Sequence, residues 1–206
     1  MHSSSGKRLH YYILYKPYGV ICQFTDDAGR PTLAGLGRFP GDVYSVGRLD
    51  TDSEGLVLLC NDGQLKHSLL DPENRHPRTY LVQIERLPTP NVIDQLRTGV
   101  IIEGKITLPA EVRLLDEEPV IPPRPVPIRF RKNVPTAWIE LVLHEGRNRQ
   151  VRKMTAAVGH PTLRLLRTGM VHLTLEGLQP GEWRALTTLE IEHLWKIIAP
   201  RPSKCN

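Results

Sequence analysis

Hydrophobic residues along this chain gather in short runs that glycine, proline and charged residues interrupt. The length of these runs and their β-branched and aromatic content predict strands over 11–16, 43–46, 55–60, 80–85, 138–143, 163–167, 170–175 and 183–186. Helical spacing and capping residues predict helices over 64–70, from Thr89-Pro90 to Gly99, over 147–158 and over 187–198. Strands and helices are therefore interleaved along the chain.

Proline concentrates in one internal segment. Five of the nine residues from Pro119 to Pro127 are proline, a composition that neither a central strand nor a helix accommodates. We therefore expect an extended connection between two subdomains near 117–136, inside a main domain that spans 11–186. Outside that domain we expect a disordered N-terminal tail over 1–10, and a C-terminal helix and tail over 187–206.

The composition excludes several classes of protein. With 206 residues, 40% of them hydrophobic and 24% charged, the chain is long enough to bury a core. No apolar run approaches the roughly 20 residues of a membrane span, and the N-terminus is too polar for a secretory signal. Three cysteines without a Cys-x-x-Cys spacing argue against a disulfide framework and a structural zinc site. A cytoplasmic protein is expected.

Positive charge is unevenly distributed. The 27 Lys and Arg residues exceed the 22 Asp and Glu residues by only five, yet residues 121–153 carry eight basic side chains against two acidic ones. This asymmetry favours a phosphate backbone as the partner.

An acidic loop, 47–55, lies between two predicted strands and holds Asp50, Asp52 and Glu54 beside Arg48. The simplest interpretation is a solvated turn whose side chains cap their own backbone. A calcium loop would need Glu at its twelfth position, where Asn61 stands, and a following helix instead of a strand. An aspartyl-phosphate enzyme would need a phosphate-binding loop, which the chain lacks.

The segment 145–160 places arginines at the start of a predicted helix. Val151, Met154, Thr155 and Val158 share the face that packs on a sheet, and Arg149, Arg152, Lys153 and Ala156 share the opposite face. An ordinary amphipathic helix is the simplest interpretation. However, cations at a helix N-terminus are unfavourable unless an anion lies nearby. We therefore predict that Arg152 forks onto the Asp50 carboxylate and that the other cations bind RNA phosphates.

These motifs together resemble the RsuA-type ribosomal pseudouridine synthases. The resemblance rests on Gly47-Arg-Leu-Asp50, Ser53-Glu-Gly-Leu56, Asn61-Asp-Gly63 and Glu145-Gly-Arg-Asn-Arg-Gln-Val-Arg152, in that order. Tyr15-Lys-Pro17 and Gly19-Val20 match the opening motif of the family, and Arg164-Leu-Leu-Arg167 resembles its late arginine motif. The similarity extends from about residue 11 to about residue 186.

The resemblance implies an α+β fold in which a mixed β-sheet spans two ferredoxin-like subdomains with a central RNA-binding cleft. It implies that Asp50 is the nucleophile, that Tyr80 stacks on the flipped base and that Arg152 is the partner of Asp50. Attack at C1′ of the ribose, attack at C6 of the base and a glycal route all remain open. The expected RNA-binding residues are Arg48, Arg147, Arg149, Lys153, Arg164 and Arg167.

The family resemblance implies no cofactor and no metal. Because the opening motif begins by about residue 11, we expect no S4-type domain of the kind that many relatives carry before it. That feature, the 23–30 stretch and the proline-rich connection favour a compact member of the family that acts on 23S ribosomal RNA. We expect the protein to be a monomer. The alternatives are a non-catalytic RNA-binding or ribosome-assembly protein of the same fold and a metal-dependent hydrolase that uses Asp50 and Asp52.

Overall fold

A nine-stranded mixed sheet forms the centre of the computed structural model, which describes residues 7–128 and 134–198. The main path of the sheet runs β11-β1-β3-β9-β4-β8-β7, while β2 pairs with β3 and β10 pairs with β9. The strands are β1 Tyr11–Lys16, β2 Tyr44–Ser45, β3 Glu54–Cys60, β4 Arg78–Glu85, β7 Glu111–Leu114, β8 Thr136–Leu143, β9 Thr162–Met170, β10 Leu173–Thr174 and β11 Trp183–Ala185. A separate hairpin pairs β5, Ile101–Ile102, with β6, Lys105–Ile106.

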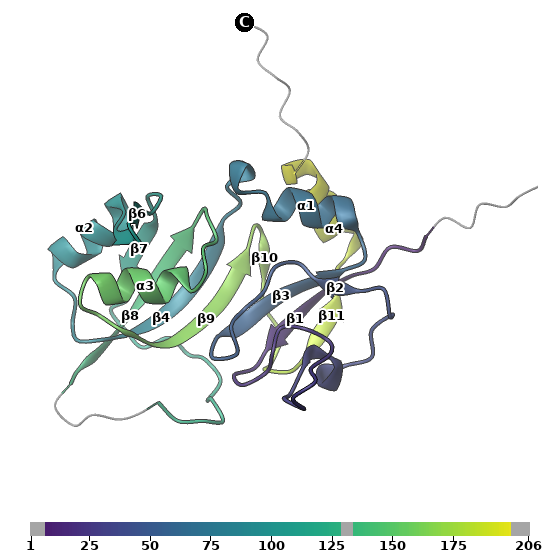
Figure 1. Cartoon of the computed structure of the whole chain (residues 1–206), viewed down its shortest axis with the longest axis horizontal. Helices are drawn as coiled ribbons and strands as arrows, with labels where there is room; N and C mark the ends of the chain where they lie inside the picture. The colour runs from purple at the N-terminus through teal and green to yellow at the C-terminus, as the bar shows by residue number, and fades with distance from the viewer. Residues whose placement is uncertain (1–6, 129–133, 199–206) are drawn as a thin grey trace, which may run out of the picture.

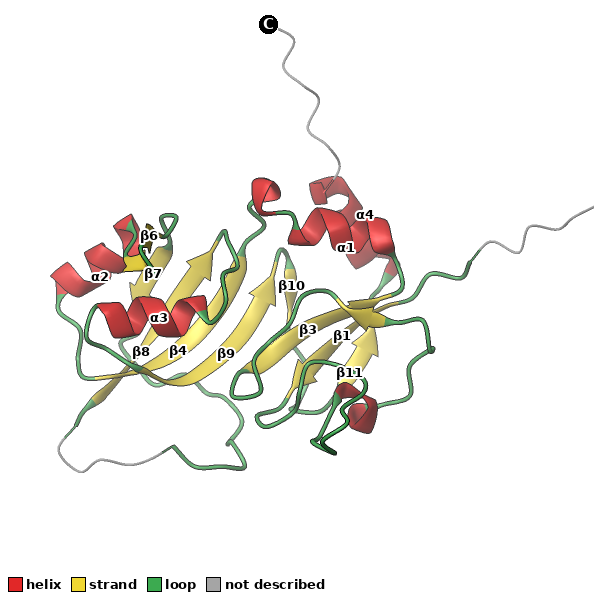
Figure 2. Cartoon of the chain, viewed as in Figure 1, coloured by secondary structure: helices red, strands yellow, loops and turns green. Residues whose placement is uncertain are grey.

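The helices pack against this sheet in two groups (Figure 1, Figure 2). The α-helices are α1 Gly63–Leu70, α2 Pro90–Thr98, α3 Gln150–Ala157 and α4 Thr188–Ile198, and the short 3₁₀ helices are η1 Leu33–Leu36 and η2 Pro72–Asn74. Helices α1 and α4 lie with β1, β3 and β11 in the first half of the molecule, whereas α2 and α3 lie with β4, β7, β8 and β9 in the second half. The α+β architecture with a mixed sheet confirms the predicted fold class.

Each half has its own hydrophobic core. In the second half, Val82 and Ile84 of β4 and Ile139 and Leu141 of β8 are fully buried, and Met154 of α3 packs against them. The predicted apolar face of α3 is therefore confirmed: Val151, Met154 and Thr155 are buried. In the first half, β1 and β3 contribute buried residues to two clusters, one beneath α1 and α4 and one beneath the loop that follows β1.

The two halves join where β3 and β9 run parallel. Only two residue pairs connect these strands, Glu54 with Leu166 and Gly55 with Arg167. Gly55 has φ +109°, and a Cβ atom on it would overlap the backbone of Arg167, so only glycine fits this close approach. Beside it, Arg164 donates to both carboxylate oxygens of Glu54 at 2.9 and 2.7 Å. A buried ion pair thus lies at the junction.

The proline-rich segment does not connect the two halves, which corrects the boundary expected near 117–136. Strands β7 and β8 on its two sides pair with each other through four residue pairs, so both belong to the second half. The chain instead passes between the halves around η2 and again after β10. Proline interrupts a strand wherever it falls, including in a connection between two paired strands, and therefore does not identify a subdomain boundary.

Most predicted elements are present, with different limits. Strand β9 extends to Met170 and takes in the start of the strand expected over 170–175. Helix α3 begins at Gln150, three residues later than expected, because Arg149 adopts a left-handed backbone conformation with φ 51°. In the described residues, 7–128 and 134–198, none of the helices has the length and apolar character of a membrane span.

Candidate active site

The acidic loop connects β2 to β3 and is held at both ends and in the middle. Gly47 turns the chain with φ +74°, and Leu49 is buried in the core of the first half. The Ser53 N–H donates to the Asp50 carbonyl at 3.1 Å, and the Gly19 N–H donates to the Thr51 carbonyl at 2.8 Å. The side chains of Asp50 and Asp52 remain about one third exposed, at 34% and 36%. The loop therefore presents two carboxylates from a fixed backbone.

Lys16 supports the acidic loop indirectly, through the turn that contains Gly19. Its side chain is fully buried, and the ammonium donates to the carbonyls of Pro17 at 3.0 Å and Val20 at 2.7 Å. These bonds shape the turn that carries Gly19. Burial lowers the pKa of Lys16 to about 8, although the nearby thiol and carboxylates, including Asp52 and Asp50, act in the opposite direction.

Lys16 is expected to make the stability of the protein depend on pH in the alkaline range. Between pH 8 and about 10.5, the unfolded chain keeps the proton on Lys16 while the folded chain releases it, so the contribution of Lys16 to stability rises with pH. Relative to Lys16→Met, the wild type should gain on the order of 2–3 kcal/mol in free energy of unfolding across this interval. Urea unfolding at several pH values measures the difference. If the difference in free energy of unfolding between the two proteins did not change with pH, the lowered pKa of Lys16 would be contradicted. Lys105→Met, at an exposed position, is the matched control.

Arg149 contacts both aspartates of the acidic loop. It donates to both carboxylate oxygens of Asp52 at 3.0 and 2.9 Å, and it lies 3.3 Å from the Asp50 carboxylate. Arg152 lies on the other side of Asp52, where it donates to the Asp52 carbonyl at 2.8 Å and approaches its carboxylate at 3.3 Å. The predicted fork of Arg152 onto Asp50 is therefore replaced by a fork of Arg149 onto Asp52 that also contacts Asp50.

The difference follows from where helix α3 begins. The left-handed conformation of Arg149 breaks the helical spacing before Gln150, so the side chain of Arg149 does not follow the face that helical spacing assigns to it. The pKa of Asp52 lies below its ordinary value: burial raises it, but the hydrogen bond from Arg149 and the charges of Arg152 and Arg149 outweigh burial. Asp52 is thus an ionised counter-charge that holds both arginines.

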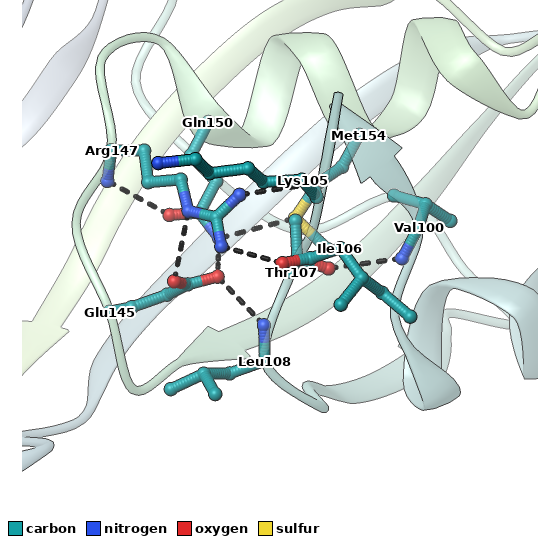
Figure 3. Close-up of polar contacts among 9 residues, drawn as sticks. All are labelled: Val100, Lys105, Ile106, Thr107, Leu108, Glu145, Arg147, Gln150 and Met154. Atoms are coloured by element: carbon teal, nitrogen blue, oxygen red, sulfur yellow. Dashed lines mark hydrogen bonds and ion pairs between the residues drawn. The ribbon is translucent and has the colours of Figure 1, made fainter. Parts of the chain in front are cut away.

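A hydrogen-bond network centred on Glu145 holds the segment that carries Arg149 (Figure 3). The Oε1 atom of Glu145 accepts from the Leu108 N–H at 2.8 Å and from the Gln150 amide at 2.6 Å. Its Oε2 atom accepts from Arg147 at 3.1 Å, and Arg147 also donates to the carbonyls of Lys105 and Ile106 at 3.2 and 2.6 Å. The network ties the start of α3 to the β5–β6 hairpin.

Besides Arg149, four of the six cations predicted to bind RNA have protein partners in the structure. Arg147 belongs to the Glu145 network, and Lys153 donates to Glu103 at 2.6 Å and to Asn148 at 3.3 Å. Arg164 and Arg167 are only 7% and 3% exposed, and Arg167 donates to the Leu56 carbonyl at 2.7 Å. Buried guanidinium groups cannot reach an RNA backbone, so the roles expected for Arg164 and Arg167 are corrected to structural ones. Arg129, Arg131 and Lys132 lie outside the described residues.

A cavity of about 340 Å³ opens between the two halves beside Asp50. Asp50 and Arg48 line it from the first half, and Tyr80 of β4 and Leu165 of β9 line it from the second, together with the 145–151 segment. Tyr80 is 9% exposed. Arg48 is exposed, and its side chain has no ion pair or hydrogen bond among the residues that the structure describes. The cavity therefore combines a carboxylate, an aromatic ring and a free cation.

The cavity offers chemistry for a nucleotide. An aromatic ring suits the face of a base, and a cation beside it suits a phosphate. Within the described ranges, no group of three or more His, Cys, Asp or Glu side chains could hold a metal ion. Asp50, Tyr80, Arg48 and Arg149, which come from distant parts of the sequence, thus meet at one place.

Sequence reasoning missed three features of this site. The hydrogen-bond network around Glu145 was not predicted from the local sequence, because its partner Leu108 lies 37 residues away. The ion pair of Glu54 with Arg164 spans 110 residues, although both residues stand in motifs that the sequence analysis singled out. The fork of Arg149 onto Asp52 depends on a single left-handed residue, which no periodicity reveals.

Comparison with known proteins agrees with the site and the fold. Residues 10–157 match the family described as RNA pseudouridylate synthase. The chain is 51% identical to ribosomal large subunit pseudouridine synthase E of Xanthomonas campestris pv. campestris, covering 84% of this chain and 92% of the relative. It is 37% identical to ribosomal large subunit pseudouridine synthase B of Bacillus subtilis, covering 89% and 70% respectively. A crystal structure of a pseudouridylate synthase superposes with a TM-score of 0.76 at 31% identity, covering 92% of this chain and 75% of that one. The sheet, the cavity around Asp50 and these relatives together identify the chain as a member of the RsuA-type pseudouridine synthases within the RNA pseudouridylate synthase family.

Proposed function

We propose that this protein converts a uridine of large-subunit ribosomal RNA into pseudouridine. The proposal rests on one observation above all: Asp50 and Tyr80 line the same cavity although they come from different halves of the molecule. The relatives named for action on the ribosomal large subunit support the choice of RNA, since they share about half of their residues with this chain.

The proposed reaction breaks the bond between N1 of uracil and C1′ of the ribose and forms a bond between C5 and C1′. C5 then loses its hydrogen as a proton, and N1 gains a proton. Asp50 is the proposed nucleophile, because it is partly exposed and borders the cavity. Tyr80 supplies a ring on which the extruded base can stack. Arg48, exposed and unpaired among the described residues, can fill the space that the base leaves in the RNA.

Release of tritium from ribosomal RNA labelled at C5 of uridine, measured with purified protein in EDTA, tests this function. Isomerisation expels the label without a metal ion. A protein that only binds RNA would release none, and a metal-dependent hydrolase would be inactive in EDTA. Mapping of pseudouridine in the ribosomal RNA of a deletion strain then identifies the modified position.

Arg149→Ala should slow the chemical step without changing how RNA affinity depends on salt. The substitution removes the cation that Asp50 and Asp52 share, and misplacement of a reacting group by about 1 Å can reduce a rate about a hundredfold. We expect a loss of that size in single-turnover tritium release. Arg149→Lys should restore part of the rate, since an ammonium cannot form the planar fork.

The salt dependence separates this role from phosphate binding. A lost phosphate contact would make the slope of log K against log salt shallower by roughly 0.7–0.9 unit. Arg113→Ala, which removes an exposed arginine on β7 that does not line the cavity, is the matched control for lost charge. A shallower slope together with an intact rate would assign Arg149 to the RNA backbone instead.

A further inference from the structure

A second cavity, of about 390 Å³, adjoins the first along the acidic loop. Both cavities are lined by Arg48, Leu49, Asp50 and Arg149. The first continues toward Tyr80, whereas the second continues toward Ile21, Cys22 and Gln23, in the loop that follows β1. Its volume lies within the range of about 300–1,000 Å³ that is typical of cavities binding small organic groups.

The position of the second cavity limits what could occupy it. If the first cavity holds the extruded uridine, the nucleotides on either side of that uridine in the same strand must leave the site close to Asp50. The second cavity begins at Asp50, so it lies within reach of one of these neighbours. The target and its neighbour would then be separated by the loop that carries Arg48.

The charges in the second cavity favour a neutral group over a phosphate. Asp50 and Asp52 both line it, and the Arg149 guanidinium is already engaged by their carboxylates. Arg48 is the only further cation in its lining. A phosphate would face two carboxylates, whereas a nucleobase carries no charge and offers hydrogen-bond donors and acceptors at its edge.

Gln23 supplies the group that could read such an edge. Its side chain is exposed, and its amide nitrogen donates to the Thr25 carbonyl at 2.8 Å. Among the described residues the side chain makes no other hydrogen bond, so one N–H donor and the oxygen acceptor can contact a ligand. An amide that presents a donor and an acceptor side by side is the group that commonly recognises a base, adenine above all, through two hydrogen bonds.

We propose that the second cavity binds the nucleobase adjacent to the target uridine and that Gln23 is a specificity-determining residue for it. The inference depends on the proposed function, because it assigns a second nucleotide of the same RNA. It predicts that the base next to the target contributes to recognition through this one side chain.

A double-mutant cycle between Gln23 and the neighbouring base tests the inference. The protein variants are wild type and Gln23→Ala, and the RNAs are a stem-loop around the mapped uridine and two copies in which the 5′ or the 3′ neighbour is abasic. For one of the two neighbours, each single change should raise KM about tenfold, the size typical of a bidentate amide–base contact. The combined change should raise KM little further, and single-turnover rates at saturation should stay within about twofold.

The outcomes separate this inference from the proposed function. The inference would be overturned if, for both neighbours, the increases in KM caused by Gln23→Ala and by the abasic nucleotide multiplied in the combined change. It would also be overturned if KM were unchanged for both abasic RNAs. The absence of pseudouridine when wild type acts on the intact RNA would instead overturn the proposed function. Gln95→Ala, on an exposed face of α2 away from both cavities, is the matched control, and thermal unfolding verifies that the Gln23 variant is folded.

Discussion

Asp50→Asn should abolish isomerisation while leaving RNA affinity within about threefold of wild type. Asparagine has nearly the same volume as aspartate, so the cavity keeps its shape, but an amide cannot act as the nucleophile. Loss of a nucleophile reduces turnover by several orders of magnitude in other enzymes, and we expect a loss of more than about a thousandfold here. Single-turnover tritium release measures the rate, and filter binding measures the affinity.

Asp94→Asn is the matched control for this substitution. Asp94 is an exposed carboxylate on α2 that pairs with Arg97 and lies far from the cavity, so its replacement should leave the rate unchanged. Residual turnover of Asp50→Asn within tenfold of wild type would remove Asp50 from the chemical step. Asp52 would not then be the obvious substitute, because both its carboxylate oxygens are engaged by Arg149.

Arg164→Met should lower the free energy of unfolding by about 3–5 kcal/mol. Glu54 is 3% exposed, and the substitution leaves its carboxylate buried at the junction of the halves without a guanidinium. Removing one partner of a buried ion pair typically has an effect of this size. Chemical denaturation at neutral pH measures the change.

The double variant Arg164→Met with Glu54→Met should recover much of that loss, since two apolar side chains leave no uncompensated charge. Arg113→Met is the control, because it breaks an exposed ion pair with Glu140 that should contribute less than about 1 kcal/mol. If the Arg164 variant were as stable as wild type but bound RNA with a shallower salt slope, Arg164 would be an RNA contact after all.

The sequence predicted the elements whose cause is local. Asp62 caps α1 by accepting from the Gln64 and Leu65 N–H groups, and Thr89 and Pro90 begin α2 as expected from their preferences. Strands β1 and β3 are apolar because they are central strands of the sheet. By contrast, β5, β6 and β7 were not predicted. Two of them contain only two residues each, too few for any periodicity to appear.

The structure gathers residues that the sequence singled out, but the one contact predicted among them, Arg152 with Asp50, is replaced by contacts of Arg152 with Asp52. The motifs identified Asp50, Tyr80 and the arginines of 147–152, and the structure brings Asp50, Tyr80 and Arg149 to one cavity. Which arginine meets which carboxylate depends on the left-handed Arg149 and on the Glu145 network, both of which are consequences of tertiary packing. A motif identifies the residue types of the site, but the pairing of its arginines with its carboxylates depends on the backbone conformation.

The proline-rich segment has an entropic consequence. Arg124 places its guanidinium 4.3 Å from the centre of the Tyr18 ring in the first half, and Arg164 donates to the Pro122 carbonyl at 2.8 Å, so the segment braces the junction through two side chains. A flexible segment would lose much conformational freedom on being held in one place in this way. Each of the five prolines removes freedom that the unfolded chain would otherwise have. The segment is therefore less flexible in the unfolded chain, so that holding it across the junction has a smaller entropic cost.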